Sequence, residues 1–184
     1  MLSRPGMSLM TEAVIAGRES MAPGGDPDMA RQDTKLESVG AEFLVLGNLL
    51  IEGSPAYKTY TNMPGYDLIV TSPSQHRAAR IQVKSRWRTK ATAILIRNFD
   101  CDFVVVAKLN RGEKGGKGSV LAPEFYVIPV GVLGAAKRSV GWGKIEFRNI
   151  PDFGSYKGRW DLIRDFLRQE PATERNLPAE IPHA

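Results

Sequence analysis

The sequences YDLIV at residues 66–70 and RIQVKSRWRTK at residues 80–90 decide the fold class of this chain and hold its most reactive groups. Both runs are short and rich in β-branched or aromatic residues, which is typical of strands. Side chains alternate between the two faces of a strand. One face of the second run therefore carries Ile81, Val83, Ser85 and Trp87, and the other carries polar and cationic groups: Gln82, Lys84, Arg86 and Arg88.

Other segments of the chain have the same strand composition and are bounded by Pro, Gly, Asn or Ser. They are AYKTYTN (56–62), CDFVVVAKLN (101–110) and EFYVIPV (124–130), which join YDLIVTS (66–72) and AARIQVKSRWR (78–88). These five segments predict a central mixed β-sheet of about five strands, flanked by helices at 33–53, 131–139 and 158–169, with a further edge strand at 144–150. The fold class is therefore α/β (α+β).

The segment 33–53 has a strong helical pattern. Its apolar residues recur at helical spacing, and we expect them to face the sheet: Leu36, Val39, Phe43, Leu46 and Leu50. Glu42 lies beside this stripe, which allows its carboxylate to look toward the sheet edge, although for a lone Glu a solvated helix acid is the favoured interpretation.

Two later segments complete the expected fold. Residues 89–100 contain two conflicting apolar periods and favour a short helical crossover over an extended segment. In the closing helix, Trp160, Ile163 and Leu167 form the expected buried stripe.

Composition limits the class of protein. The chain has 184 residues, a formal net charge of +5 and a single cysteine, Cys101, which excludes an intrachain disulfide framework. We expect one domain over residues 34–168, with a disordered or loosely ordered arm at 1–33 and a disordered tail at 169–184. No apolar run is long enough to span a membrane and no signal peptide is evident, so a cytoplasmic location is expected.

Positive charge is concentrated between residues 75 and 90, where six Lys or Arg residues occur without an acid. Such a run is commonly a solvated face. Here it shares a strand face with Gln82 and Lys84, which favours contact with a phosphodiester backbone. The candidate nucleic-acid-binding residues are Arg77, Arg80, Arg86, Arg88 and Lys90.

These motifs resemble the PD-(D/E)xK nuclease superfamily, in a branch of small endonuclease-like domains with Gln in the second motif position. The resemblance rests on GAEFLVLGNLLIEG, GYDLIV, IQVKSR, DFVVVAKL and FYVIPV in this order, and spans about residues 36–130. It implies a restriction-endonuclease-like core. The sequence departs from the family pattern at Tyr66, where Pro is usual, and at Gln82, which replaces an acid.

The resemblance implies a catalytic set of Asp67, Gln82, Lys84 and Glu42. Asp67 is the central metal ligand in this set, and Glu42, Gln82 and the carbonyl of Val83 complete the shell around Mg2+ or Mn2+. Lys84 lies near the attacking water and the scissile phosphate. Because Gln82 is neutral, metal affinity is expected to be lower than in a site with three acids.

Three functions remain open from the sequence. The first is a divalent-metal-dependent endonuclease that hydrolyses phosphodiester bonds in DNA and forms a homodimer when both strands are cut. The second is a catalytically degenerate nuclease-fold module that binds nucleic acid or a protein partner without cleavage. The third is an unrelated α/β domain in which the motif occurs by coincidence.

Overall fold

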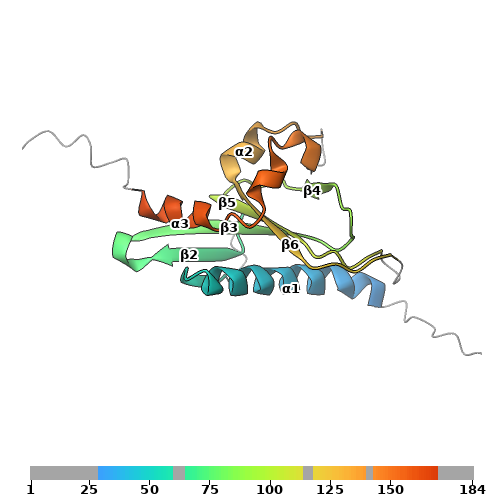
Figure 1. Cartoon of the computed structure of the whole chain (residues 1–184), viewed down its shortest axis with the longest axis horizontal. Coiled ribbons are helices and arrows are strands. Elements are labelled where there is room, and N and C mark those ends of the chain that lie inside the picture. The colour runs from blue at the N-terminus through green and yellow to red at the C-terminus, as the bar shows by residue number, and fades with distance from the viewer. Residues whose placement is uncertain (1–28, 60–64, 114–117, 140–142, 170–184) are drawn as a thin grey trace, which may run out of the picture. The chain divides into compact units, whose positions relative to one another are not determined.

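Five strands form one mixed sheet in the order β1-β2-β3-β5-β6 (Figure 1). β3 and β5 are parallel, whereas the other neighbouring pairs are antiparallel. The five segments predicted as strands are the ones that form this sheet, which confirms the mixed sheet flanked by helices. Their bounds are β1 (Ala56–Lys58), β2 (Leu68–Ser72), β3 (Arg77–Arg86), β5 (Phe103–Lys108) and β6 (Glu124–Pro129).

The computed structural model describes residues 29–59, 65–113, 118–139 and 143–169, and side chains from residue 34 onward. Most of the predicted N-terminal arm and of the predicted C-terminal tail lies outside these residues. None of the described helices is long and apolar enough to cross a lipid bilayer.

One face of the sheet packs against α1 (Met29–Ile51) and α3 (Asp161–Arg168). The odd-numbered residues Ile81 and Val83 of β3 share a buried cluster with Val45 of α1 and Ile163 of α3. The alternation predicted for β3 is therefore confirmed on this side, because its apolar set enters the core. The buried stripe predicted for the closing helix is also confirmed, since Trp160, Ile163 and Leu167 are all buried.

The face of α1 predicted to contact the sheet was wrong. Ala41, Val45 and Leu49 are buried against the sheet, whereas Leu36, Phe43 and Leu50 are exposed, and Val39 and Leu46 lie between these extremes. The helix carries apolar residues on two opposite sides, so spacing alone did not identify the inner one. The helix also begins at Met29, four residues before the expected start.

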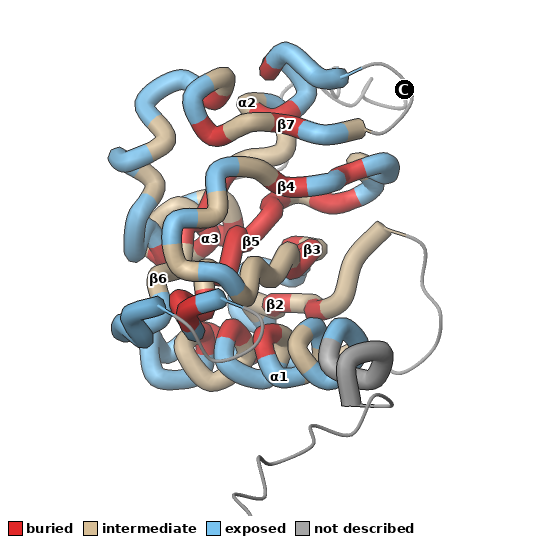
Figure 2. Tube along the Cα trace, turned by 90° about the vertical axis from the view of Figure 1, so that its right-hand side faces the viewer, coloured by how far each residue is buried: buried red, intermediate tan, exposed pale blue. Residues whose placement is uncertain are grey.

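A second, smaller core covers the opposite face of the sheet. It contains α2 (Val130–Ala135) and a two-stranded sheet of β4 (Ala93–Leu95) and β7 (Lys144–Glu146), which lie above the main sheet in Figures 1 and 2. The even-numbered residues Val104 and Val106 of β5 face this core.

The helix favoured for residues 89–100 was wrong, because this segment holds strand β4. Ile94 and Ile96 are buried while Leu95 between them is exposed, which is the period of a strand. β4 pairs with β7, which lies about fifty residues later in the chain. Only this distant partner selects the extended conformation. The edge strand predicted at 144–150 is shorter, because a 3-10 turn follows β7 at Phe147–Asn149.

The β4–β7 pair ends at Gly143, which supplies a first prediction. Gly143 has φ +64°, and a Cβ atom there would lie 2.4 Å from the carbonyl oxygen of Ile96. We expect Gly143→Ala to lower the free energy of unfolding by about 1–3 kcal/mol through strain and clash. Gly131→Ala in α2 is the control, because a Cβ there meets nothing within 4 Å. Equal melting temperatures for the two variants would contradict this assignment.

Candidate active site

Asp67 is held against the middle of β3. The register pairs Leu68 with Ile81, so one step further places Asp67 opposite Gln82. The backbone N–H of Val83 donates a hydrogen bond of 2.7 Å to Oδ2 of Asp67, and the N–H of Asp67 donates one of 2.8 Å to the Ile81 carbonyl. The carboxylate therefore lies beside the Gln82-Val83-Lys84 triplet.

Gln82 projects from the face of β3 that does not contact α1. The residue is 7% exposed, and its Oε1 atom has no hydrogen-bond partner within the described part of the chain. A buried amide oxygen without a donor is unfavourable. The Oε1 atom of Gln82 is therefore free to bind a cation or a hydrogen-bond donor.

Lys84 lies on the same face as Gln82 and is half-buried. Burial lowers the pKa of the Lys84 ammonium below its ordinary value, while the nearby Asp67 carboxylate opposes this change by attraction. Arg86 acts in the same direction as burial because it is a like charge. Asp67 and Lys84 are thus within electrostatic reach of each other, although they lie on different strands.

Asp67, Gln82 and Val83 supply oxygen atoms that fit a hard divalent cation. The N–H and C=O of one strand residue point to the same edge, so the Val83 carbonyl faces the side on which Asp67 lies. Carboxylate, amide and carbonyl oxygens are the ligands that Mg2+ accepts. Among the described residues no group of three or more His, Cys, Asp or Glu could hold a metal. A site here therefore depends on the amide and backbone oxygens.

Glu42 is placed away from this group. Its carboxylate forms an ion pair with Lys58 of β1, and among the described side chains it makes no hydrogen bond or ion pair with Asp67, Gln82 or Lys84. The acid of α1 that reaches β3 is Glu37, which accepts a 2.9 Å hydrogen bond from the hydroxyl of Ser85. Glu37 lies four residues before the buried Ala41, and this spacing was the only signal of its position in the sequence.

All four predicted phosphate-binding arginines make contacts within the protein, and two of these, Arg77 and Arg80, reach segments beyond β3. The Arg77 guanidinium lies over the Phe166 ring, 4.8 Å from its centroid. Arg80 is bound by the carboxylates of Asp100 and Asp102. These contacts connect β3 to α3 and to the segment before β5.

Arg86 has an internal role as well. Its Nε atom donates a 2.5 Å hydrogen bond to the carbonyl of Ala93, which connects β3 to β4. Burial lowers the pKa of Arg86, and the nearby Glu37 opposes this change. Arg88 and Lys90 remain exposed, although Arg88 also pairs with Glu113 at 3.4 Å. These two residues are the most accessible of the five predicted cations.

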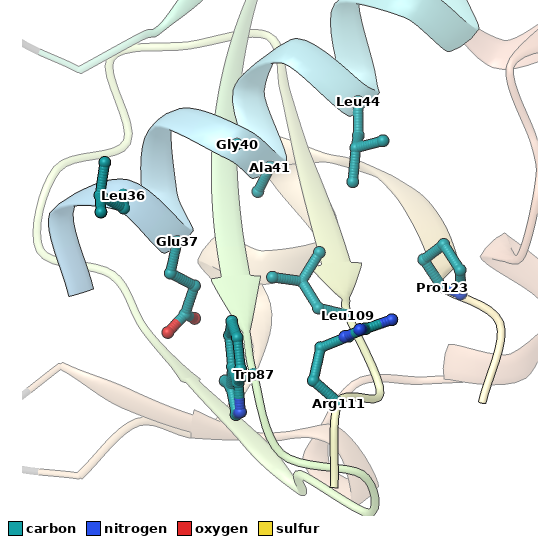
Figure 3. A pocket seen from close by; sticks show the side chains of 9 residues that line it. All are labelled: Leu36, Glu37, Gly40, Ala41, Leu44, Trp87, Leu109, Arg111 and Pro123. Carbon is teal, nitrogen blue, oxygen red and sulfur yellow. The ribbon is translucent and has the colours of Figure 1, made fainter. Parts of the chain in front are cut away.

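A pocket of about 620 Å3 opens beside the C-terminal end of β3, between α1 and the loops after β3 and β5 (Figure 3). Its lining is mostly apolar and does not include Asp67, Gln82 or Lys84, so it is separate from the candidate active site. The lining residues are Leu36, Glu37, Gly40, Ala41, Leu44, Trp87, Leu109, Arg111 and Pro123.

The hydrogen bond between Asp67 and Val83 gives a second prediction. Asp67→Ala removes the acceptor of the Val83 amide, and we expect the free energy of unfolding to fall by about 1–2 kcal/mol. Asp67→Asn keeps an oxygen acceptor of the same length and should cost less than half as much. Chemical denaturation of the wild type and both variants measures the difference. Equal losses would show that the amide does not depend on this side chain.

No family model and no curated protein matches the chain. Among solved structures it is similar to a bacterial homing endonuclease, I-Ssp6803I, with 23% sequence identity and a TM-score of 0.51. The match covers 72% of this chain and 92% of that chain. At this level of identity the likeness concerns the fold. The chain therefore shares its fold with that homing endonuclease.

Proposed function

We propose that the chain is a divalent-metal-dependent endonuclease that hydrolyses phosphodiester bonds in DNA, with a site of the PD-(D/E)xK type. The observation that carries the proposal is the hydrogen bond from Val83 N–H to Asp67. It brings the carboxylate from the start of β2 to the centre of the Gln82-Val83-Lys84 triplet.

The proposed metal ligands are Asp67, Gln82 and the carbonyl of Val83, and the proposed ion is Mg2+ or Mn2+. When bound, such an ion lowers the pKa of a coordinated water and offsets charge on the phosphate. The buried Oε1 of Gln82 supports this assignment, because a cation would satisfy it. Glu42 is a weaker candidate, because its carboxylate is already neutralised by Lys58.

Lys84 would act on the substrate directly. Its ammonium offers three donors that can bind a non-bridging phosphate oxygen and orient the attacking water. Partial burial reduces screening by solvent, so the attraction to the negative charge that develops in the transition state is stronger than at an exposed position. Asp67 helps to keep Lys84 protonated despite its burial.

DNA is the proposed partner because the structurally similar protein is a homing endonuclease and because cations continue beyond Lys84 along the chain. Arg88 and Lys90 are the proposed backbone contacts, since both are exposed. A single site cuts one strand at a time. Cleavage of both strands would therefore be served by a homodimer that presents two sites.

The alternative is a catalytically degenerate nuclease fold that binds nucleic acid or a protein partner without cleavage. Two observations favour it: Gln82 replaces an acid, and Glu42 is paired with Lys58. Of the two acids in the proposed catalytic set, only Asp67 then lies beside the Gln82-Val83-Lys84 triplet. A single carboxylate binds Mg2+ weakly.

Cleavage assays with Mg2+ and Mn2+ test the catalytic assignment. We expect Lys84→Met to reduce the cleavage rate by about 100-fold or more while DNA binding persists, because it removes a transition-state contact. Asp67→Asn should reduce the rate to a similar extent by weakening metal binding. Cleavage that survives Lys84→Met unchanged would indicate a contaminating nuclease and would remove the assignment.

The substitution Gln82→Glu separates the two proposed functions. It adds a charged oxygen at the same length, and we expect it to tighten Mn2+ binding by about tenfold in calorimetry without DNA. An active wild type should keep or raise its cleavage rate in this variant. A wild type that is inert with both metals but binds DNA would support the degenerate module. Unchanged Mn2+ affinity would contradict the place of Gln82 in the metal shell.

The salt dependence of DNA binding tests the cationic contacts. Arg88→Ala and Lys90→Ala should each weaken binding evenly across sequences and reduce the salt slope by about one unit, as expected for backbone contacts. Lys157→Ala is the control, because Lys157 is exposed but pairs with Glu124 of β6, away from the segment that follows β3. Equal slopes for the wild type and the Arg88→Ala, Lys90→Ala double mutant would exclude these residues from the interface.

A further inference from the structure

The side of α1 that faces away from the sheet is apolar over about four turns. Five of the nine large apolar side chains that are exposed in the described part of the chain lie on this one helix. Figure 2 shows pale blue, exposed segments along α1. These five residues define the outer face of α1: Leu36 (65% exposed), Phe43 (51%), Leu44 (44%), Leu50 (52%) and Ile51 (85%).

Charged residues are excluded from the outer face. At 100° per residue, the five apolar side chains fall on one side of the helical wheel together with Gly40 and Gly47. The charged residues of this stretch fall at its flanks or on the inner half of the helix. A surface helix usually presents a polar face to water. An apolar face on each side instead indicates a helix that is covered on both sides, and an exposed patch of this kind marks an interaction site.

The two glycines of the outer face point to a close helix contact. A Cβ atom at Gly40 or Gly47 would meet nothing within 4 Å, so the core does not require glycine at either position. Glycine in a helix interior is unfavourable relative to alanine. Its benefit is that another backbone can approach closely.

The outer face is nearly symmetric about Phe43. Leu36 precedes Phe43 by seven residues and Leu50 follows it by seven, while Gly40 and Gly47 lie three residues before and four after. Alternating steps of three and four are the spacing of a helix-to-helix seam. Reversing the direction of the helix therefore leaves almost the same pattern. A two-fold contact requires a patch that is complementary to itself, and this pattern meets that requirement.

We infer that the outer face of α1 binds the same face of a second copy of this chain, with the two helices antiparallel and crossing near Phe43. Leu36 then packs against Leu50 of the partner subunit, and the glycines lie beside the crossing. The seam residues themselves are uncharged. The Lys58 ammonium lies beside the seam, 5.7 Å from the centroid of the Phe43 ring, and is paired with Glu42 of the same subunit. Leu36, Gly40 and Leu44 also line the pocket of Figure 3, which offers a recess for an apolar side chain of the partner.

Residues 1–28 of the same chain are the competing occupant. Their sequence contains seven Gly or Pro residues and four acids and does not repeat the seven-residue spacing of Leu36, Phe43 and Leu50. They are therefore a poorer match to a continuous apolar helix face than α1 itself. The inference does not depend on the proposed nuclease activity, although two copies would supply a site for each DNA strand.

Analytical ultracentrifugation of the full chain, without nucleic acid or divalent metal, tests the inference. We expect a dimer whose dissociation constant rises by at least about 100-fold in Phe43→Glu, because a charged side chain would replace an apolar one at the crossing. Val120→Glu, at another exposed apolar residue, is the matched control and should leave the dimer intact. A monomeric wild type, or a dimer that Phe43→Glu leaves unchanged, would overturn the inference.

Cysteine cross-linking tests the antiparallel arrangement. Under copper-catalysed oxidation by dissolved oxygen, Phe43→Cys should form a covalent dimer with itself. Leu36→Cys should cross-link with Leu50→Cys in a mixture but not with itself. The native Cys101 gives no background, because burial raises the pKa of its thiol to about 11 and the residue is inaccessible. Self-linking by Leu36→Cys, or none by Phe43→Cys, would overturn the antiparallel seam.

Discussion

The hydrogen bond between the Val83 amide and the Asp67 carboxylate is the interaction on which the candidate site depends. Asp67 precedes β2, the strand between β1 and β3. Without the hydrogen bond to Val83, its carboxylate would have no fixed position relative to β3. Bonded to β3, it becomes the neighbour of Gln82 and Lys84. The same contact satisfies a backbone donor at a position where the ladder between β2 and β3 ends. One side chain thus has a structural role and also places a negative charge beside the Gln82-Val83-Lys84 triplet.

The strand β3 connects the two halves of the fold because its two faces have different chemistry. Ile81 and Val83 enter the core shared with α1 and α3, so the position of the strand is set by burial. Gln82, Lys84 and Arg86 are turned toward the smaller core, where Arg86 contacts β4. The resulting burial accounts for the lowered pKa of Lys84 and Arg86. Apolar packing on one side therefore rigidly positions reactive groups on the other.

Internal contacts also explain which cations are available for a substrate. Arg77, Arg80 and Arg86 connect β3 to α3, to the residues before β5 and to β4, respectively. Their guanidinium groups are well suited to this work, because they offer several donors in a fixed plane. The positively charged residues concentrated between positions 75 and 90 thus fall into two groups. One group holds the sheet together, and the exposed group, Arg88 and Lys90, faces solvent.

The sequence by itself determined the five strands of the sheet, the closing helix and the alternation along β3. These features follow from local patterns that tertiary contacts reinforce, since a period of two or 3.6 residues is visible within one segment. It also indicated that Asp67, Gln82 and Lys84 belong together, because strand alternation and motif order carry that information.

Only the tertiary structure decided the features that depend on distant partners. α1 is apolar on two sides, and the sheet alone selected Ala41, Val45 and Leu49 as the inner one. β4 is extended because β7 pairs with it. Glu42 meets Lys58 and Glu37 meets Ser85 because of how α1 is rotated on the sheet. A local pattern lists the surfaces that a segment can bury, but the contacts that cover them are made elsewhere in the chain.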